Sequence, residues 1–102
     1  MEYEINASKY FKDQFENLDE KSRRILSDKI RLIKQNPYRY KGVHSMLFSK
    51  VFSVRFSIAR KETRMIYVVL GKKVILACLL DRKNDYKDLG KYLSSLKNEM
   101  GL

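Results

Sequence analysis

Apolar residues in the first third of the chain recur with the period of a helix. A short alternating stretch at residues 3–5 indicates a strand, after which Asn6 or Ser8 can cap a first helix. A second, basic helix follows Asp19, and Asn36-Pro37 ends it because a residue before proline is pushed out of the α region. With almost no linker between them, the two helices should form an antiparallel hairpin. Their inward stripes are Phe11, Phe15, Leu18, Ser22, Leu26, Ile30 and Ile33.

The period changes to two in the second half of the chain. Residues 52–58 alternate apolar and polar, and a polar turn at residues 60–63 separates them from a second strand at residues 64–70. A tight reversal at residues 71–73 leads into the continuous apolar run 74–80, which is typical of a central strand. Short turns predict an antiparallel meander. The stretch 38–48 has no clean period and is expected to be a loop.

The helical period returns after residue 84. Tyr86, Leu89, Leu93, Leu96 and Met100 step by three and four residues, which predicts an amphipathic helix. The order β-α-α-β-β-β-α predicts an α+β fold. In it, an N-terminal strand and an α-helical hairpin pack on a twisted antiparallel β-sheet, and a C-terminal helix leaves the other face exposed or only partly covered. We expect residues 1–102 to form a single domain.

The charge balance indicates a polyanionic partner. The chain has 22 lysines and arginines against 12 aspartates and glutamates, a net charge of +10. Residues 1–47 hold ten bases and seven acids, a net of +3, and residues 48–102 hold twelve and five, a net of +7. The excess therefore concentrates on the half that carries the predicted sheet. An ordinary basic surface remains the simpler explanation of charge taken alone.

Several classes of protein are excluded by residue content. A lone Cys78 cannot form an internal disulfide, and with one histidine, His44, the ligand count excludes a structural zinc site. No apolar run reaches the length of a membrane span, and the acidic start lacks the features of a signal peptide. We expect a cytoplasmic protein that works without a metal or a small-molecule cofactor.

Candidate chemistry lies on the predicted open face of the sheet. If residues 52–58 turn their apolar side to the helices, Arg55 points to the open side, Arg64 begins the next strand and Arg82 follows the last. These arginines can gather on a concave face, and their planar forks suit a phosphate group. The rim of this predicted anion-binding face consists of Lys50, Arg60, Lys61 and Lys83 around Arg55.

Three motifs occur in a familiar order. Ile30-x-x-Ile33-x-x-Asn36-Pro37 precedes the sheet, Arg64-Met65-Ile66-Tyr67 opens a strand, and Asp81-Arg82-Lys83-Asn84-Asp85-Tyr86 follows the last strand. Over nearly the whole chain this order resembles the RelE branch of the RelE/ParE toxin superfamily. The resemblance implies a metal-independent endoribonuclease that cuts messenger RNA in the A site of the ribosome, by attack of a ribose 2′-hydroxyl on the adjacent phosphate. It also implies a cognate RelB-like antitoxin that folds on binding.

The resemblance also implies roles for three residues. Arg64 matches the arginine that contacts the scissile phosphate, Arg82 matches one that supports the charge of the transition state, and Tyr86 matches a tyrosine that stacks on a base or takes part in proton transfer. The chain departs from the pattern in two places. Ser57 and Ala59 stand where that branch has basic residues, unless a shorter turn brings Arg60 there. Asp81 stands where some relatives have histidine, so the general base stays open.

Two other functions fit the same features. A ParE-like inhibitor of DNA gyrase has the same fold and needs no nuclease residues, so the joint presence of Arg64, Arg82 and Tyr86 argues against it. A nucleic-acid-binding domain without catalysis would use its cations only to neutralise phosphates. Such a domain would leave RNA intact and would bind it with steep salt dependence.

Overall fold

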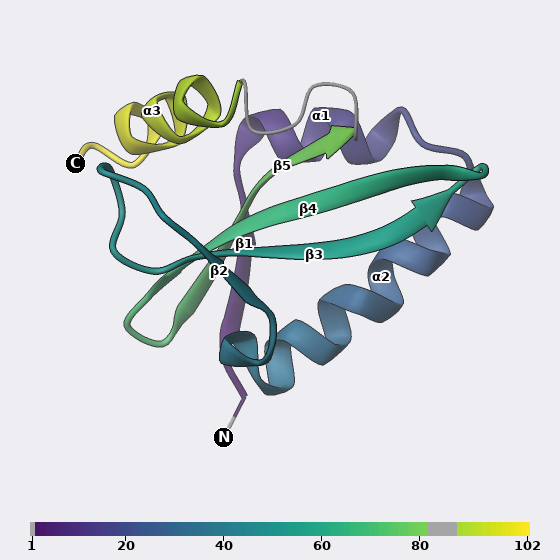
Figure 1. Cartoon of the computed structure of the whole chain (residues 1–102), viewed down its shortest axis with the longest axis horizontal. Coiled ribbons are helices and arrows are strands. Elements are labelled where there is room, and N and C mark those ends of the chain that lie inside the picture. The colour runs from purple at the N-terminus through teal and green to yellow at the C-terminus, as the bar shows by residue number, and fades with distance from the viewer. Residues whose placement is uncertain (1, 82–87) are drawn as a thin grey trace.

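Five strands form one sheet in the order β1-β5-β4-β3-β2 (Figure 1). The computed structural model describes residues 2–81 and 88–102. Its strands are β1 (Glu4–Ala7), β2 (Lys41–Val43), β3 (Val51–Ile58), β4 (Lys61–Leu70) and β5 (Lys73–Asp81). Its helices are α1 (Lys9–Glu16), α2 (Glu20–Gln35) and α3 (Leu89–Glu99), with a short 3-10 helix, η1 (Pro37–Arg39). Among the described residues, no helix has the length and apolar content that a bilayer span requires.

The sheet is antiparallel except at one edge. Strands β2 to β5 pair antiparallel, as the short turns predict, but β1 pairs parallel with β5, with Glu4 opposite Lys73 and Ala7 opposite Leu76. The sheet is therefore mixed. Helices α1 and α2 follow β1 in the chain, so no short turn joins β1 to its partner β5. Strand β2 is a second difference, since Lys41–Val43 pairs with residues 51–53 inside the stretch expected to be a loop.

The helix boundaries follow the predicted caps. Ser8 Oγ accepts a hydrogen bond from the Phe11 N–H at 2.9 Å, and Asp19 Oδ1 accepts one from the Ser22 N–H at 2.8 Å. Each cap satisfies an N–H group that has no partner within its helix. Helix α2 ends at Gln35, ahead of Asn36 and Pro37 as predicted.

The sheet separates two apolar layers (Figure 1). On one face, α1 and α2 pack against alternate residues of the central strands; the buried members of this layer include Phe11, Leu26, Ile33, Val54, Phe56, Met65 and Tyr67. On the other face, α3 covers part of the sheet with Leu89, Leu93 and Leu96, which pack among Ile66, Val68, Cys78 and Leu80. The expectation of a partly covered second face is confirmed, and α3 is the element that covers it.

Candidate functional site

Arg55 and Arg64 lie directly opposite each other on β3 and β4. Their neighbours Val54 and Met65 are buried against the helical hairpin, so alternation places both arginines on the other face of the sheet. The Arg55 side chain is 61% exposed, and Arg64 is half-buried. Like charges directly opposite each other in a sheet destabilise it, so a bound anion would relieve their repulsion. The two arginines thus form the predicted cationic centre of the face.

A carboxylate lies beside this arginine pair. Glu62 Oε1 is 3.7 Å from Arg55 Nε, and Glu62 pairs in register with Ser57. The Arg55 side chain is 61% exposed and that of Glu62 34%, so solvent screens this ion pair and it contributes little to stability. Glu62 lies within residues 60–63, which the sequence pattern predicts to be a turn, so its place on this face was not expected. The turn in the structure is shorter, so Glu62 belongs to β4 and lies on the same face of the sheet as Arg64.

The β3–β4 turn holds two residues, Ala59 and Arg60, instead of the four predicted. Both have positive φ values, 50° and 66°, in the left-handed region that asparagine and glycine prefer in such turns. Neither residue favours that conformation, so no local signal marks a turn at this point. Arg60 and the exposed Lys61 therefore lie at the tip of the hairpin, roughly 10 Å along β4 from Arg64 at 3.3 Å per residue.

Ser57 lies at a β3 position where the resemblance leads us to expect a basic residue. It is exposed on the same face as Arg55 and Arg64, two residues from Arg55 along β3. The shorter turn does not put Arg60 at this position, because Arg60 belongs to the turn itself. A serine hydroxyl is a poor general base near neutral pH, and no histidine lies opposite Ser57 on β4. Among the described residues of this strand face, the Glu62 carboxylate is the side chain that can accept a proton.

The remaining candidates lie elsewhere. Lys50, expected on the rim of this face, instead donates a hydrogen bond from Nζ to the Tyr38 hydroxyl at 3.3 Å, on the side of the sheet where Phe52 packs. Arg82, Lys83 and Tyr86 fall in residues 82–87, outside the described residues. Strand β5 ends at Asp81, opposite Thr63, so the segment containing Arg82 follows the strand that pairs with the Arg64 strand.

Two reactive side chains serve the core. Burial raises the pKa of the Cys78 thiol to about 12, which leaves it protonated and unreactive at neutral pH. Burial also raises the pKa of Tyr67 above its ordinary value, and its hydroxyl donates to the Pro37 carbonyl. Both side chains are fully buried and belong to the core. Within residues 2–81 and 88–102 no three His, Cys, Asp or Glu side chains are placed to hold a metal ion. The arginines of the described face can stabilise an anion electrostatically.

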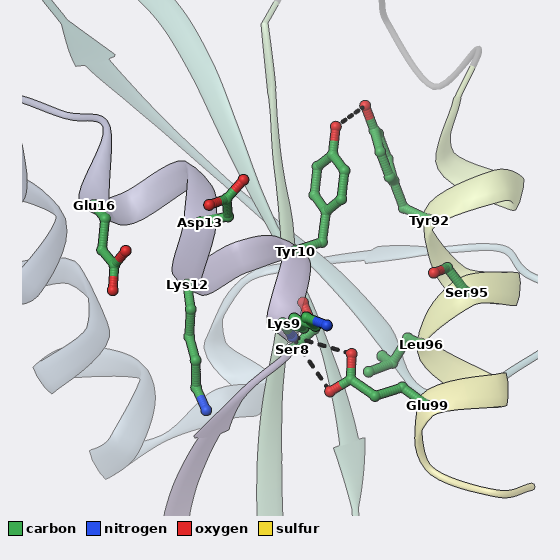
Figure 2. A pocket seen from close by; sticks show the side chains of 10 residues that line it. All are labelled: Ser8, Lys9, Tyr10, Lys12, Asp13, Glu16, Tyr92, Ser95, Leu96 and Glu99. Atoms are coloured by element: carbon green, nitrogen blue, oxygen red, sulfur yellow. Dashed lines mark hydrogen bonds between the residues drawn. The ribbon is translucent and has the colours of Figure 1, made fainter.

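Helix α3 meets α1 across a groove with polar contacts on its floor (Figure 2). The Tyr10 hydroxyl donates to the Tyr92 hydroxyl at 3.1 Å, and this contact raises the pKa of Tyr92. The Glu99 carboxylate accepts from the Lys9 N–H, with Oε1 and Oε2 at 3.0 and 3.2 Å. An acidic side chain is favourable at this position, the first turn of α1. These contacts and three buried leucines hold α3 in place.

Solved structures share the fold of this chain. No protein-family model matches the chain, and no curated protein does either. A mutant of the *E. coli* toxin RelE in its free state superposes with a TM-score of 0.75 and 12% identity, over 94% of this chain and 98% of that chain. The isolated *E. coli* RelE toxin gives 0.65 and 16%, over 87% and 96%. A chain of the intact *E. coli* RelBE toxin–antitoxin complex gives 0.63 and 14%, over 76% and 94%. The expected fold is thereby confirmed: this chain has a RelE-like fold.

Proposed function

We propose that the chain is the toxin of a type II toxin–antitoxin system, a ribosome-dependent endoribonuclease that cleaves messenger RNA in the A site. The observation that carries the proposal is the opposed pair Arg55 and Arg64, on the open face of a RelE-like sheet in a chain of net charge +10. A pair of arginines matches the geometry and charge of an RNA phosphate. The RelE likeness supports the toxin assignment over a generic basic domain.

The proposed reaction requires only alignment and charge stabilisation. The ribose 2′-hydroxyl loses its proton and its oxygen forms a bond to the adjacent phosphorus, while the bond to the 5′ oxygen breaks and that oxygen takes up a proton. The products are a 2′,3′-cyclic phosphate and a 5′-hydroxyl. Arg64, with Arg55 beside it, would stabilise the extra negative charge of the transition state. Arg82 would add to this, and Tyr86 would stack on a base or transfer a proton, as the resemblance implies.

The ribosome would hold the RNA strand in the geometry that the reaction requires. General acid–base catalysis typically contributes about 10²–10⁴-fold, so the absence of a strong base at Ser57 slows the reaction without preventing it. Both reacting groups lie in one RNA strand, and holding that strand in an in-line geometry accounts for much of the acceleration. The isolated protein is therefore expected to cleave free RNA poorly and ribosome-bound RNA well.

A protein partner follows from the same proposal. The RelBE structure is that of a toxin with its antitoxin. For this chain we propose a short acidic antitoxin that folds on the basic surface and covers the sheet face or displaces α3. The α3 helix is short, with eleven residues, and its polar contacts with α1 are exposed, so it should open more readily than the core. If deletion of residues 87–102 left both activity and antitoxin binding unchanged, this role of α3 would be refuted.

Primer-extension mapping of a translated message tests the function. In a purified translation system, the wild-type protein should produce cuts at the codon in the A site, and the double variant Arg64→Ala, Arg82→Ala should produce none. An intact message with wild-type protein would contradict the proposal. Inhibition of gyrase supercoiling by the same preparation would then identify a gyrase inhibitor, and salt-sensitive binding of intact RNA would identify a non-catalytic binding domain.

A further inference from the structure

One continuous part of the chain is free of acidic residues. Residues 29–61 contain nine lysines and arginines and no aspartate or glutamate. Arg55, Arg60 and Lys61 belong to the face and hairpin tip described above. Arg39, Lys41 and Lys50 lie in or beside η1, β2 and the start of β3, at another place on the surface. Three cations therefore lie at a part of the chain apart from the arginine pair.

Three aromatic rings connect this part of the chain to the core. The rings of Tyr67 and Phe52 stack with centroids 5.5 Å apart and an interplanar angle of 20°. Phe52 in turn meets Tyr38 edge to face at 5.5 Å and 88°, and Tyr3 contacts Tyr38 from another side at 6.3 Å. Tyr67 is fully buried, whereas Tyr38 is 44% exposed. The series of rings thus starts in the core and ends with a tyrosine that solvent can reach.

The backbone that carries Tyr38 is fixed as well. The Tyr38 N–H donates to Asn36 Oδ1 at 3.2 Å, and the buried Tyr67 hydroxyl donates to the carbonyl of Pro37, the preceding residue. A ring held in this way loses little conformational freedom when it binds a ligand, which favours affinity. An exposed, immobilised aromatic ring is the feature on which unpaired nucleobases stack.

A cation accompanies the exposed ring. Lys50 Nζ lies 3.3 Å from the Tyr38 hydroxyl and 5.4 Å from its ring centroid, and the Lys50 carbonyl accepts a hydrogen bond from Val69 at 3.0 Å. The backbone of Lys50 is therefore anchored to β4, while its side chain is exposed. A nucleotide stacked on Tyr38 would bring its phosphate within reach of this ammonium group.

We propose that Tyr38 and Lys50 form a second RNA subsite, in which Tyr38 stacks on an unpaired base and Lys50 contacts a phosphate. The inference rests on the proposed function in that its ligand is RNA. Phe52 and Arg55 point to opposite faces of β3, so the nucleotide bound at Tyr38 is not the one held by the arginine pair. The subsite contributes affinity and position, and takes no part in the chemical step.

Binding of a short single-stranded RNA that contains 2-aminopurine tests the subsite, with the full chain and without ribosomes. Replacing an aromatic ring that stacks on a base typically costs enough to weaken binding about tenfold, so Tyr38→Leu should show this loss. Tyr38→Phe, which keeps the ring, should bind within about twofold of wild type. Tyr10→Leu is the matched control, because Tyr10 is also 44% exposed but lies on α1. Thermal unfolding of each variant checks its fold.

The possible results of these experiments distinguish failure of the subsite from failure of the proposed function. Strong RNA binding by the wild type with equal affinities for Tyr38→Leu and Tyr10→Leu would overturn the subsite and leave the function intact. A wild-type protein that binds no RNA would overturn the subsite, while the proposed function would still be decided by message cleavage on ribosomes. Should Tyr38→Leu fail to fold, photocrosslinking of 4-thiouridine RNA to the wild type decides the question. Crosslinks at Tyr38 support the subsite, and crosslinks confined to other peptides refute it.

Discussion

The side-chain amide of Gln14 makes both hydrogen bonds that a neighbouring strand would make with Leu79. Its Nε2 donates to the Leu79 carbonyl at 2.9 Å, and its Oε1 accepts from the Leu79 N–H at 2.7 Å. Strand β1 ends at Ala7, and the Ser8 hydroxyl satisfies the Ala77 carbonyl at 2.8 Å. Side chains at and within α1 thus continue the pairing of β5 after β1 stops. The next residue, Leu80, lies opposite Arg64, so Gln14 supports the strand beside the arginine pair.

Replacing Gln14 with leucine should destabilise the fold. The change leaves a partly buried N–H and a carbonyl of Leu79 without their partners, which typically costs about 1–3 kcal/mol. Urea denaturation should show this decrease in the free energy of unfolding. Gln35→Leu is the matched control on the exposed last turn of α2. Equal stabilities of the two variants would mean that the Gln14 contact contributes nothing.

Local features of the fold were predictable, whereas the long-range ones were not. Helix caps at Ser8 and Asp19 and the alternation that puts Arg55 on the open face depend on residues close in sequence, so the pattern predicts them. The bond between Gln14 and Leu79 joins residues 65 positions apart, and no local signal reveals it. The parallel pairing of β1 was missed for the same reason.

The candidate site was predictable to the extent that it depends on strand alternation. Arg55 and Arg64 share the open face as expected. The position of the turn was not predictable, because Ala59 and Arg60 adopt left-handed conformations without the glycine or asparagine that marks such turns. The predicted turn therefore starts one residue and ends three residues too late, which includes Glu62 in the turn instead of in β4. The same alternation, continued by one step from Phe52, puts Lys50 on the face opposite the arginine pair, and only its contact with Tyr38 depends on tertiary structure.

The stability of the protein should fall at alkaline pH, in part through Cys78. Its folded-state pKa of about 12 exceeds the ordinary thiol value near 9, so its contribution is complete below about pH 9 and is lost as the pH rises towards 12. In Cys78→Ala this part of the decline is absent. Urea titrations between about pH 9 and 11 should give a wild-type slope steeper by up to about 1.4 kcal/mol per pH unit. If stability fell with pH at the same rate in the wild type and in Cys78→Ala, Cys78 would have the same pKa in the folded and unfolded states.

Neutralising Arg55 should weaken RNA binding without unfolding the protein. Arg55→Gln removes one of two opposed like charges, so the free energy of unfolding should change by no more than about 0.5 kcal/mol. The slope of log affinity against log salt for single-stranded RNA should fall by about 0.7, the value for one phosphate contact. Lys72→Gln removes a charge of the same sign in the exposed β4–β5 turn and should leave the slope unchanged. An unchanged slope in Arg55→Gln would remove Arg55 from the interface.

The proposed chemistry depends on one hydroxyl of the substrate. A message with a single 2′-deoxynucleotide on the 5′ side of the mapped cut should resist cleavage at that position, because the nucleophile is missing. The same substitution one codon upstream serves as the control and should leave cleavage unchanged. Cleavage at the deoxynucleotide would mean that water attacks the phosphate in place of the 2′-hydroxyl, and it would contradict the proposed reaction.

The most direct test of the central claim is the single-turnover rate of message cleavage in purified ribosomes with an empty A site. We predict rapid cleavage by the wild type, an equal rate for Lys72→Ala and a rate at least about 100-fold lower for Arg64→Ala, the usual effect of removing a group that stabilises transition-state charge. Thermal unfolding should be similar for the two variants. Cleavage by Arg64→Ala at the wild-type rate would contradict the assignment of the arginine pair, and no cleavage by the wild type would contradict the proposed nuclease.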